Sequence, residues 1–119
     1  MSRRTDRVAD LLRAEVSEVI RLEVDDPRVK LATASEVDVS PDLRHAVVRI
    51  SVLDAEEEAR RETLAGLRRA AGFIRGRLAR RLRQMKRLPE LTFELDRGAE
   101  YSDTIERLLE STHDQDQST

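Results

Sequence analysis

The 119-residue chain contains no cysteine and no tryptophan, and aromatic residues make up only 3% of it. A chain without thiols forms no disulfide, no thiolate metal site and no cysteine nucleophile. It also has no run of about 20 apolar residues, which a membrane-spanning helix needs. Met1 to Asp6 lacks the apolar core of a signal peptide. We therefore expect a cytoplasmic protein with no membrane partner, built around one aliphatic core.

Acidic residues are absent from one long segment, Thr63 to Pro89, which we call the basic segment. Its nine cations are Arg68, Arg69, Arg75, Arg77, Arg80, Arg81, Arg83, Lys86 and Arg87. Subtracting these nine from the 22 basic residues leaves 13 against 24 acidic residues elsewhere, so a net charge of −2 conceals a local +9. Solvated helices normally mix the two signs, because like charges three or four residues apart repel. A run of one sign therefore indicates a surface for a polyanion, and phosphates are the obvious ligand.

The spacing of apolar residues predicts an α+β domain. Steps of three and four predict a helix over residues 5–23 that stops at Asp25-Asp26-Pro27. Alternation predicts a β-hairpin and, after the basic segment, a third strand over 91–95. One side of the first hairpin strand would carry Leu31, Thr33, Ser35, Val37 and Val39, and one side of the second Ala46, Val48, Ile50 and Val52. A short helix ending near Leu109 would complete the domain.

One long helix is expected to occupy most of the segment between the second and third strands and to end at Pro89. Its apolar stripe consists of Leu64, Leu67, Ala71, Ile74, Leu78, Leu82 and Met85. On a helical wheel Arg80, Arg83 and Arg87 lie opposite Ile74, so the outer surface would be basic. Gly72 costs a helix about 1 kcal/mol relative to alanine and predicts a kink. Two interpretations stay open: a tight helix contact, or a break whose free N–H groups bind phosphate.

The run Arg69-Ala70-Ala71-Gly72-Phe73-Ile74-Arg75, preceded by Asp26-Pro27-Arg28 and by Val37 to Arg44, resembles bacterial ribosome-binding factor A. Pro89 to Phe93 resembles its last-strand region, and the similarity extends from about Thr5 to Leu109. It implies a type II KH-like domain, with helices packed on one face of a three-stranded mixed sheet. It also implies a long helix kinked at Ala70-Ala71-Gly72, where other KH domains carry a Gly-x-x-Gly phosphate loop.

The same resemblance implies an assembly factor that binds free or immature 30S subunits and 16S rRNA. It would assist late maturation, including processing of the 16S rRNA 5′ end, and adaptation to cold. We expect a monomeric domain over residues 1–110 without a catalytic site, metal, cofactor or small-molecule substrate. Residues 111–119 contain no apolar side chain, so we expect a disordered acidic tail there.

Eight cations are expected to bind RNA: Arg68, Arg69, Arg75, Arg77, Arg80, Arg83, Lys86 and Arg87. Of these, Arg75, Arg80, Arg83 and Arg87 would contact phosphate, while the others would add to the positive field. Base stacking is not expected, because Phe73 and Phe93 are both assigned to the core and Tyr101 is the one other aromatic residue.

Two other function classes compete with RNA binding. A protein-interaction adapter would dock the basic helix on an acidic partner, and salt titration distinguishes the two because phosphate binding releases counterions. An enzyme is the weaker alternative, since neither His45 nor His113 has a catalytic constellation around it. Asp25-Asp26 and Asp114-Gln115-Asp116 offer Mg²⁺-type ligands, but acidic residues at helix ends and in tails are far more often structural.

Overall fold

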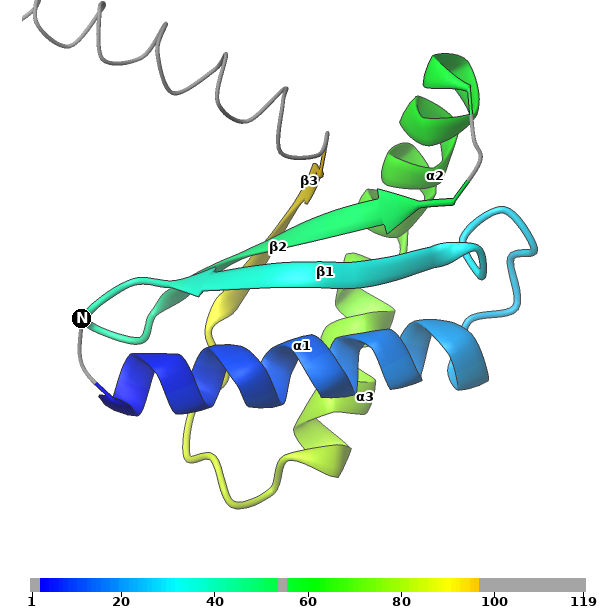
Figure 1. Ribbon diagram of the computed structural model, residues 1–119. Coiled ribbons are helices and arrows are strands. Elements are labelled where there is room, and N and C mark those ends of the chain that lie inside the picture. Colours follow the sequence, from blue (N-terminus) through cyan, green and yellow to red (C-terminus); the bar gives the residue numbers. More distant parts are fainter. Residues whose placement is uncertain (1–2, 54–55, 97–119) are drawn as a thin grey trace, which may run out of the picture.

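The computed structural model describes residues 3–53 and 56–96, which form an α+β domain (Figure 1). The elements in chain order are α1 (Arg3–Glu23), β1 (Ala32–Val39), β2 (His45–Val52), α2 (Glu57–Arg69), α3 (Ala71–Arg81) and β3 (Glu90–Leu95). The terminal helix predicted near Leu109 and the tail over 111–119 lie outside the described residues. Of the helices that the structure describes, none has the length and apolarity needed to cross a membrane.

The three strands form one mixed sheet in the order β1-β2-β3. β1 and β2 pair antiparallel as the predicted hairpin, and β3 pairs parallel to β2. Figure 1 shows α1 and α3 on the same side of the sheet, with α1 running along β1. The predicted architecture of helices on one face of a three-stranded mixed sheet is therefore confirmed.

The core between α1, α3 and the sheet is almost entirely aliphatic, as the composition predicts. Its fully buried side chains include Leu12, Val16, Val19 and Ile20 of α1, Val48 and Ile50 of β2, Ile74 and Leu78 of α3, and Phe93 of β3. Burying each such side chain stabilises the fold by about 1.5–3 kcal/mol. The predicted inner face of β2 is confirmed, because Ala46, Val48, Ile50 and Val52 are all buried.

The predicted inner face of β1 is wrong in its first half. Ala32 and Ala34 are buried there, whereas Leu31 is 65% exposed. The pairing register with β2 shifts between Ala34 and Glu36, which is a β-bulge. A bulge adds one residue to one strand and so exchanges the faces on either side of it. Val37 consequently returns to the core, and simple alternation fails across this point.

The predicted long helix is divided at Ala70 and ends earlier than expected. Ala70 has φ −87° and ψ 1°, and it separates α2 from α3 within the predicted kink. α3 ends at Arg81, so residues 82–89 form a loop, which we call the α3–β3 loop. The helix cannot continue to Pro89, because the N–H of Glu90 bonds the carbonyl of Arg44 at 2.8 Å and draws the chain back to the start of β2.

The close backbone contact occurs at Gly66 and not at Gly72. A Cβ built on Gly66 would lie 2.8 Å from Cγ2 of Val29, which is buried in the loop between α1 and β1. A Cβ on Gly72 would meet nothing within 4 Å, so the tight-contact interpretation of Gly72 is wrong. Nearby, the hydroxyl of Thr63 donates to the carbonyl of Arg28, so α2 is seated on this loop at two points.

A pair of alanine substitutions tests this assignment. Gly66→Ala should destabilise the protein by about 1–2 kcal/mol, because overpacking costs about 1–3 kcal/mol and outweighs the gain in helix propensity. Gly72→Ala should be neutral or stabilise by up to about 1 kcal/mol, because its site is open. Urea denaturation followed by circular dichroism measures both, and equal effects at the two positions would contradict the packing described here.

Candidate nucleic-acid interface

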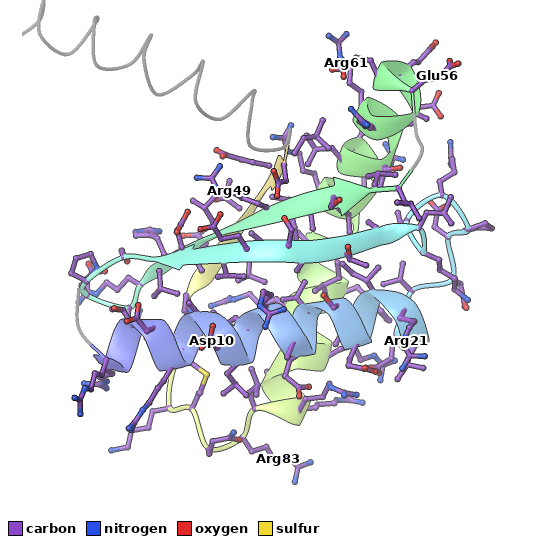
Figure 2. The ribbon with its side chains drawn as sticks, in the orientation of Figure 1. Asp10, Arg21, Arg49, Glu56, Arg61 and Arg83 are labelled. Atoms are coloured by element: carbon purple, nitrogen blue, oxygen red, sulfur yellow. The ribbon has the colours of Figure 1, made fainter. Side chains whose placement is uncertain are left out.

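The basic segment forms the end of α2, all of α3 and the α3–β3 loop. Arg68 and Arg69 lie in the last turn of α2, and Arg75, Arg77 and Arg80 lie on α3. Arg83, Lys86 and Arg87 lie in the loop, so the prediction that they continue the helical surface is wrong. The reason is the end of α3 at Arg81, beyond which the wheel no longer applies. Figure 2 shows Arg83 pointing away from the sheet.

Carboxylates of α1 neutralise two of the nine cations. Arg81 donates from Nε to Oε2 of Glu15 at 2.6 Å, and its Nη1 lies 3.7 Å from Oε2 of Glu23. The hydrogen bond to Glu15 is the main reason that the pKa of Arg81 is raised above its ordinary value. Arg77 Nε lies 3.6 Å from the other oxygen of Glu23. These contacts join α3 to α1, and both arginines contribute little to the outer positive field.

Two further arginines donate to neutral backbone carbonyls and form no ion pair with the described residues. Arg68 Nη2 donates to the carbonyl of Phe93 at 3.2 Å, linking α2 to β3. Arg75 Nη2 donates to the carbonyl of Leu88 at 3.3 Å, linking α3 to the α3–β3 loop. A guanidinium has five N–H donors, so each side chain retains donors for a phosphate after one such bond.

The remaining five cations of the basic segment are exposed and have no ion pair or hydrogen bond to any residue that the structure describes. They are Arg69, Arg80, Arg83, Lys86 and Arg87. The last four lie within eight consecutive residues at the end of α3, and we call them the basic end. The loop is held against the core by three apolar residues: Leu82 and Pro89 are buried, and Met85 is partly buried. The basic side chains between them therefore point outward.

The structure contradicts the assignment of Phe73 to the core. It is 44% exposed, whereas Phe93 is buried as predicted. The guanidinium carbon of Arg77 lies 4.9 Å from the centroid of the Phe73 ring, which is a cation–π distance. The signal was available in the sequence, because Phe73 falls about 100° from Ile74 on the helical wheel, outside the apolar stripe.

Comparison with known proteins identifies the family of the chain. The family model described as ribosome-binding factor A matches residues 4–109. The chain belongs to this family. Ribosome-binding factor A of Azoarcus sp. (strain BH72) is 43% identical over 114 residues, covering 96% of this chain and 89% of the relative.

Solved structures of family members share the fold. The solution structure of a putative ribosome binding factor A from Thermotoga maritima superposes with a TM-score of 0.69 and 34% identity, covering 84% of this chain and 93% of that one. A homology model of Thermus thermophilus ribosome binding factor A, fitted into a cryo-EM map of its complex with the 30S subunit, gives a TM-score of 0.60 and 35% identity, covering 74% of this chain and 90% of that one. The family and the KH-like fold implied by the sequence resemblance are both confirmed.

The residues considered for catalysis in the sequence, His45 and Asp26, make contacts that stabilise the fold. His45 Nδ1 lies 3.8 Å from Glu90 Oε2, and both side chains are mostly exposed at the parallel strand pair. Asp26 accepts the N–H of Arg28 at 3.0 Å and so closes the turn after α1. Over residues 3–53 and 56–96, no group of three or more potential ligands is arranged to hold a metal ion. His113 and Asp114-Gln115-Asp116 lie outside this part.

The neighbouring residues Arg80 and Arg81 allow a test of the link between α1 and α3. Arg81→Gln removes contacts with Glu15 and Glu23, so we expect its melting temperature to fall below that of the parent. Arg80→Gln removes an exposed charge and should leave the melting temperature unchanged. The deficit of Arg81→Gln should shrink in 1 M salt, because screening weakens exposed ion pairs. Equal melting of both variants by circular dichroism would contradict the link.

Proposed function

We propose that this protein is an assembly factor of the small ribosomal subunit that binds free or immature 30S particles. It would do so by placing the basic end and Arg69 on phosphates of 16S rRNA. The observation that carries this proposal is the group of four exposed cations, Arg80, Arg83, Lys86 and Arg87, without a carboxylate partner among the residues described. The 30S complex of the Thermus thermophilus relative supports the choice of particle.

The distribution of charge supports a defined orientation on the RNA. On the open face of the sheet, Arg49 is surrounded by the carboxylates of Glu36, Asp38 and Glu94 at 3.8, 3.1 and 3.7 Å. This face would repel a phosphate backbone, whereas the basic end would attract one. Exposed charges act over a Debye length of about 8 Å at physiological salt. A protein with a net charge of −2 can therefore still bind RNA, provided that it does so through its basic surface.

The protein can assist maturation of the 30S subunit by binding alone, without catalysis. A factor that binds one arrangement of the rRNA more tightly than another shifts the equilibrium toward it. We propose that the protein in this way assists late 30S maturation, including processing of the 16S rRNA 5′ end by other enzymes, and leaves before translation. It would act as a cytoplasmic monomer without a cofactor. The family match ends at residue 109, which supports a domain boundary near residue 110.

Charge reversal at the basic end tests the proposed surface. The double variant Arg80→Glu/Arg83→Glu should weaken binding to purified 30S subunits by about 10- to 30-fold or more at 0.15 M salt, as expected from two lost phosphate contacts. Co-sedimentation of the protein with free 30S subunits measures this effect. Circular dichroism should remain that of the parent, because both side chains are exposed.

The matched control is Arg21→Glu/Arg61→Glu, which changes the charge equally. Figure 2 shows Arg21 and Arg61 at sites remote from Arg83, at the end of α1 and the start of α2. The control should sediment with 30S subunits like the parent. Loss of binding in both variants would indicate a response to net charge alone and would overturn the assignment of the surface.

Salt titration of neutral variants distinguishes RNA from an acidic protein partner. Each phosphate contact contributes about 0.7–0.9 to the slope of log affinity against log salt concentration. With protein-free 16S rRNA, Arg80→Gln should lower the magnitude of this slope by about that amount, whereas Arg81→Gln should leave it nearly unchanged because Glu15 already neutralises Arg81. Binding to whole subunits but not to free rRNA would instead favour the adapter alternative.

A further inference from the structure

Phe73 occupies an unusual position for an exposed aromatic ring. It lies in the first turn of α3, three residues after the break at Ala70, and it is 44% exposed. It is the one aromatic side chain of the basic segment, and the residues beside it along the chain include no carboxylate. The charged residues nearest to this ring along the chain are therefore all cations.

The two glycines of α3 place no side chain beside the ring on one side of the helix. A Cβ placed on Gly72 or on Gly76 would meet no other atom of the described chain within 4 Å. On the helical wheel Gly76 and Gly72 lie about 60° and 100° from Phe73 on one side, and Arg77 lies about 40° away on the other. A flat ligand that approaches from this side therefore meets no side chain at either glycine, and Arg80, about 20° from Phe73 on the same side, borders its path.

Arg77 closes the other side. Its guanidinium carbon lies 4.9 Å from the ring centroid, and its Nε lies 3.6 Å from Glu23. The ring is thus backed by a planar cation that α1 holds in place. Arg77 contacts both Phe73 and Glu23, so we do not expect it to bind phosphate as the exposed cations would.

Free cations flank the ring along the chain. Arg80 lies seven residues after Phe73, about 20° away on the wheel and roughly 10 Å along the helix. Arg69 lies four residues before it, at the end of α2. Neither has a partner in the described part of the chain. A π surface between two phosphate-binding groups is the pattern with which proteins hold single-stranded nucleic acid.

We propose that Phe73 is a stacking site for one unpaired nucleobase, bordered by Gly72 and Gly76 and backed by Arg77. The proposal rests on the proposed rRNA binding and narrows it to RNA with an unpaired nucleotide at this position. A duplex keeps its bases stacked on one another, whereas an unpaired base can be splayed onto an aromatic ring. A stack of this kind does not distinguish strongly between bases, because each of them has a π face.

The test uses the full chain with Phe73→Leu and Phe73→Trp. Leucine keeps apolar volume but removes the ring, and tryptophan keeps a stacking face. Phe73→Leu should weaken binding to a single-stranded oligoribonucleotide by about 5- to 150-fold, the loss that follows from removing one base–aromatic stack. Its binding to an RNA duplex of equal length should change little. Phe73→Trp should bind the single strand as tightly as the parent. Both variants should melt like the parent, because the side chain is half exposed.

Fluorescence provides a readout that a merely structural role would not change. The chain contains no tryptophan, so Phe73→Trp introduces a single indole. Stacking of a base should quench its emission saturably with the single strand and much less with the duplex. The matched control, Leu22→Trp, places an indole at a residue of α1 that is 55% exposed and should show no saturable quenching.

The outcomes separate this inference from the function on which it rests. If Phe73→Leu binds the single strand like the parent while Arg80→Glu/Arg83→Glu does not, the stacking site is wrong and the rRNA-binding surface stands. If Phe73→Leu loses single strand and duplex equally without quenching in Phe73→Trp, the ring makes a non-stacking contact, and the proposal also fails. If the charge-reversed variant binds rRNA and 30S subunits like the parent, the proposed rRNA-binding surface fails, and the stacking site loses the contacts on which it rests.

Discussion

The parallel pairing of β3 with β2 is the constraint on which the rest of this structure depends. β2 ends at Val52, yet β3 begins beside His45, at the opposite end of that strand. A strand of eight residues spans about 26 Å, so the chain must return over this distance before β3 can start. α2, α3 and the α3–β3 loop make that return. The basic segment therefore makes up most of the crossover connection, and its place on the molecule follows from the topology of the sheet.

The crossover also explains how the charges are divided. The side of α3 that packs toward α1 carries Arg77 and Arg81, and α1 supplies Glu15 and Glu23 to meet them. The outward cations, Arg69 and the basic end, find no such partner in the described residues. On the far side of the sheet, carboxylates gather around Arg49. The result is a molecule with two electrically different faces, although its net charge is close to zero.

Much of the fold could be predicted because its signals are local. The helix over 5–23, the inner face of β2 and the kink near Ala70 each follow from periodicity or from a single glycine. The features that the sequence analysis mispredicted have a different origin, since each depends on a tertiary contact. The bulge near Ser35 reflects pairing with β2, and the end of α3 at Arg81 reflects the return to β3. The close packing of Gly66 requires Val29, which lies 37 residues earlier in the sequence.

The bend between α2 and α3 has a consequence for how the molecule meets its partner. Ala70 is the one residue between the two helices, and it bonds to both: its N–H donates to the carbonyl of Gly66 at 3.0 Å, and its carbonyl accepts the N–H of Ile74 at 2.9 Å. Because α2 is held on the loop at Val29 and Arg28 and α3 is held on α1 through Arg77 and Arg81, the fold fixes the angle between the two helices. Preorganised surfaces lose little conformational entropy on association, and more of the contact energy then appears as affinity. The RNA, and not the protein, would have to adjust its shape.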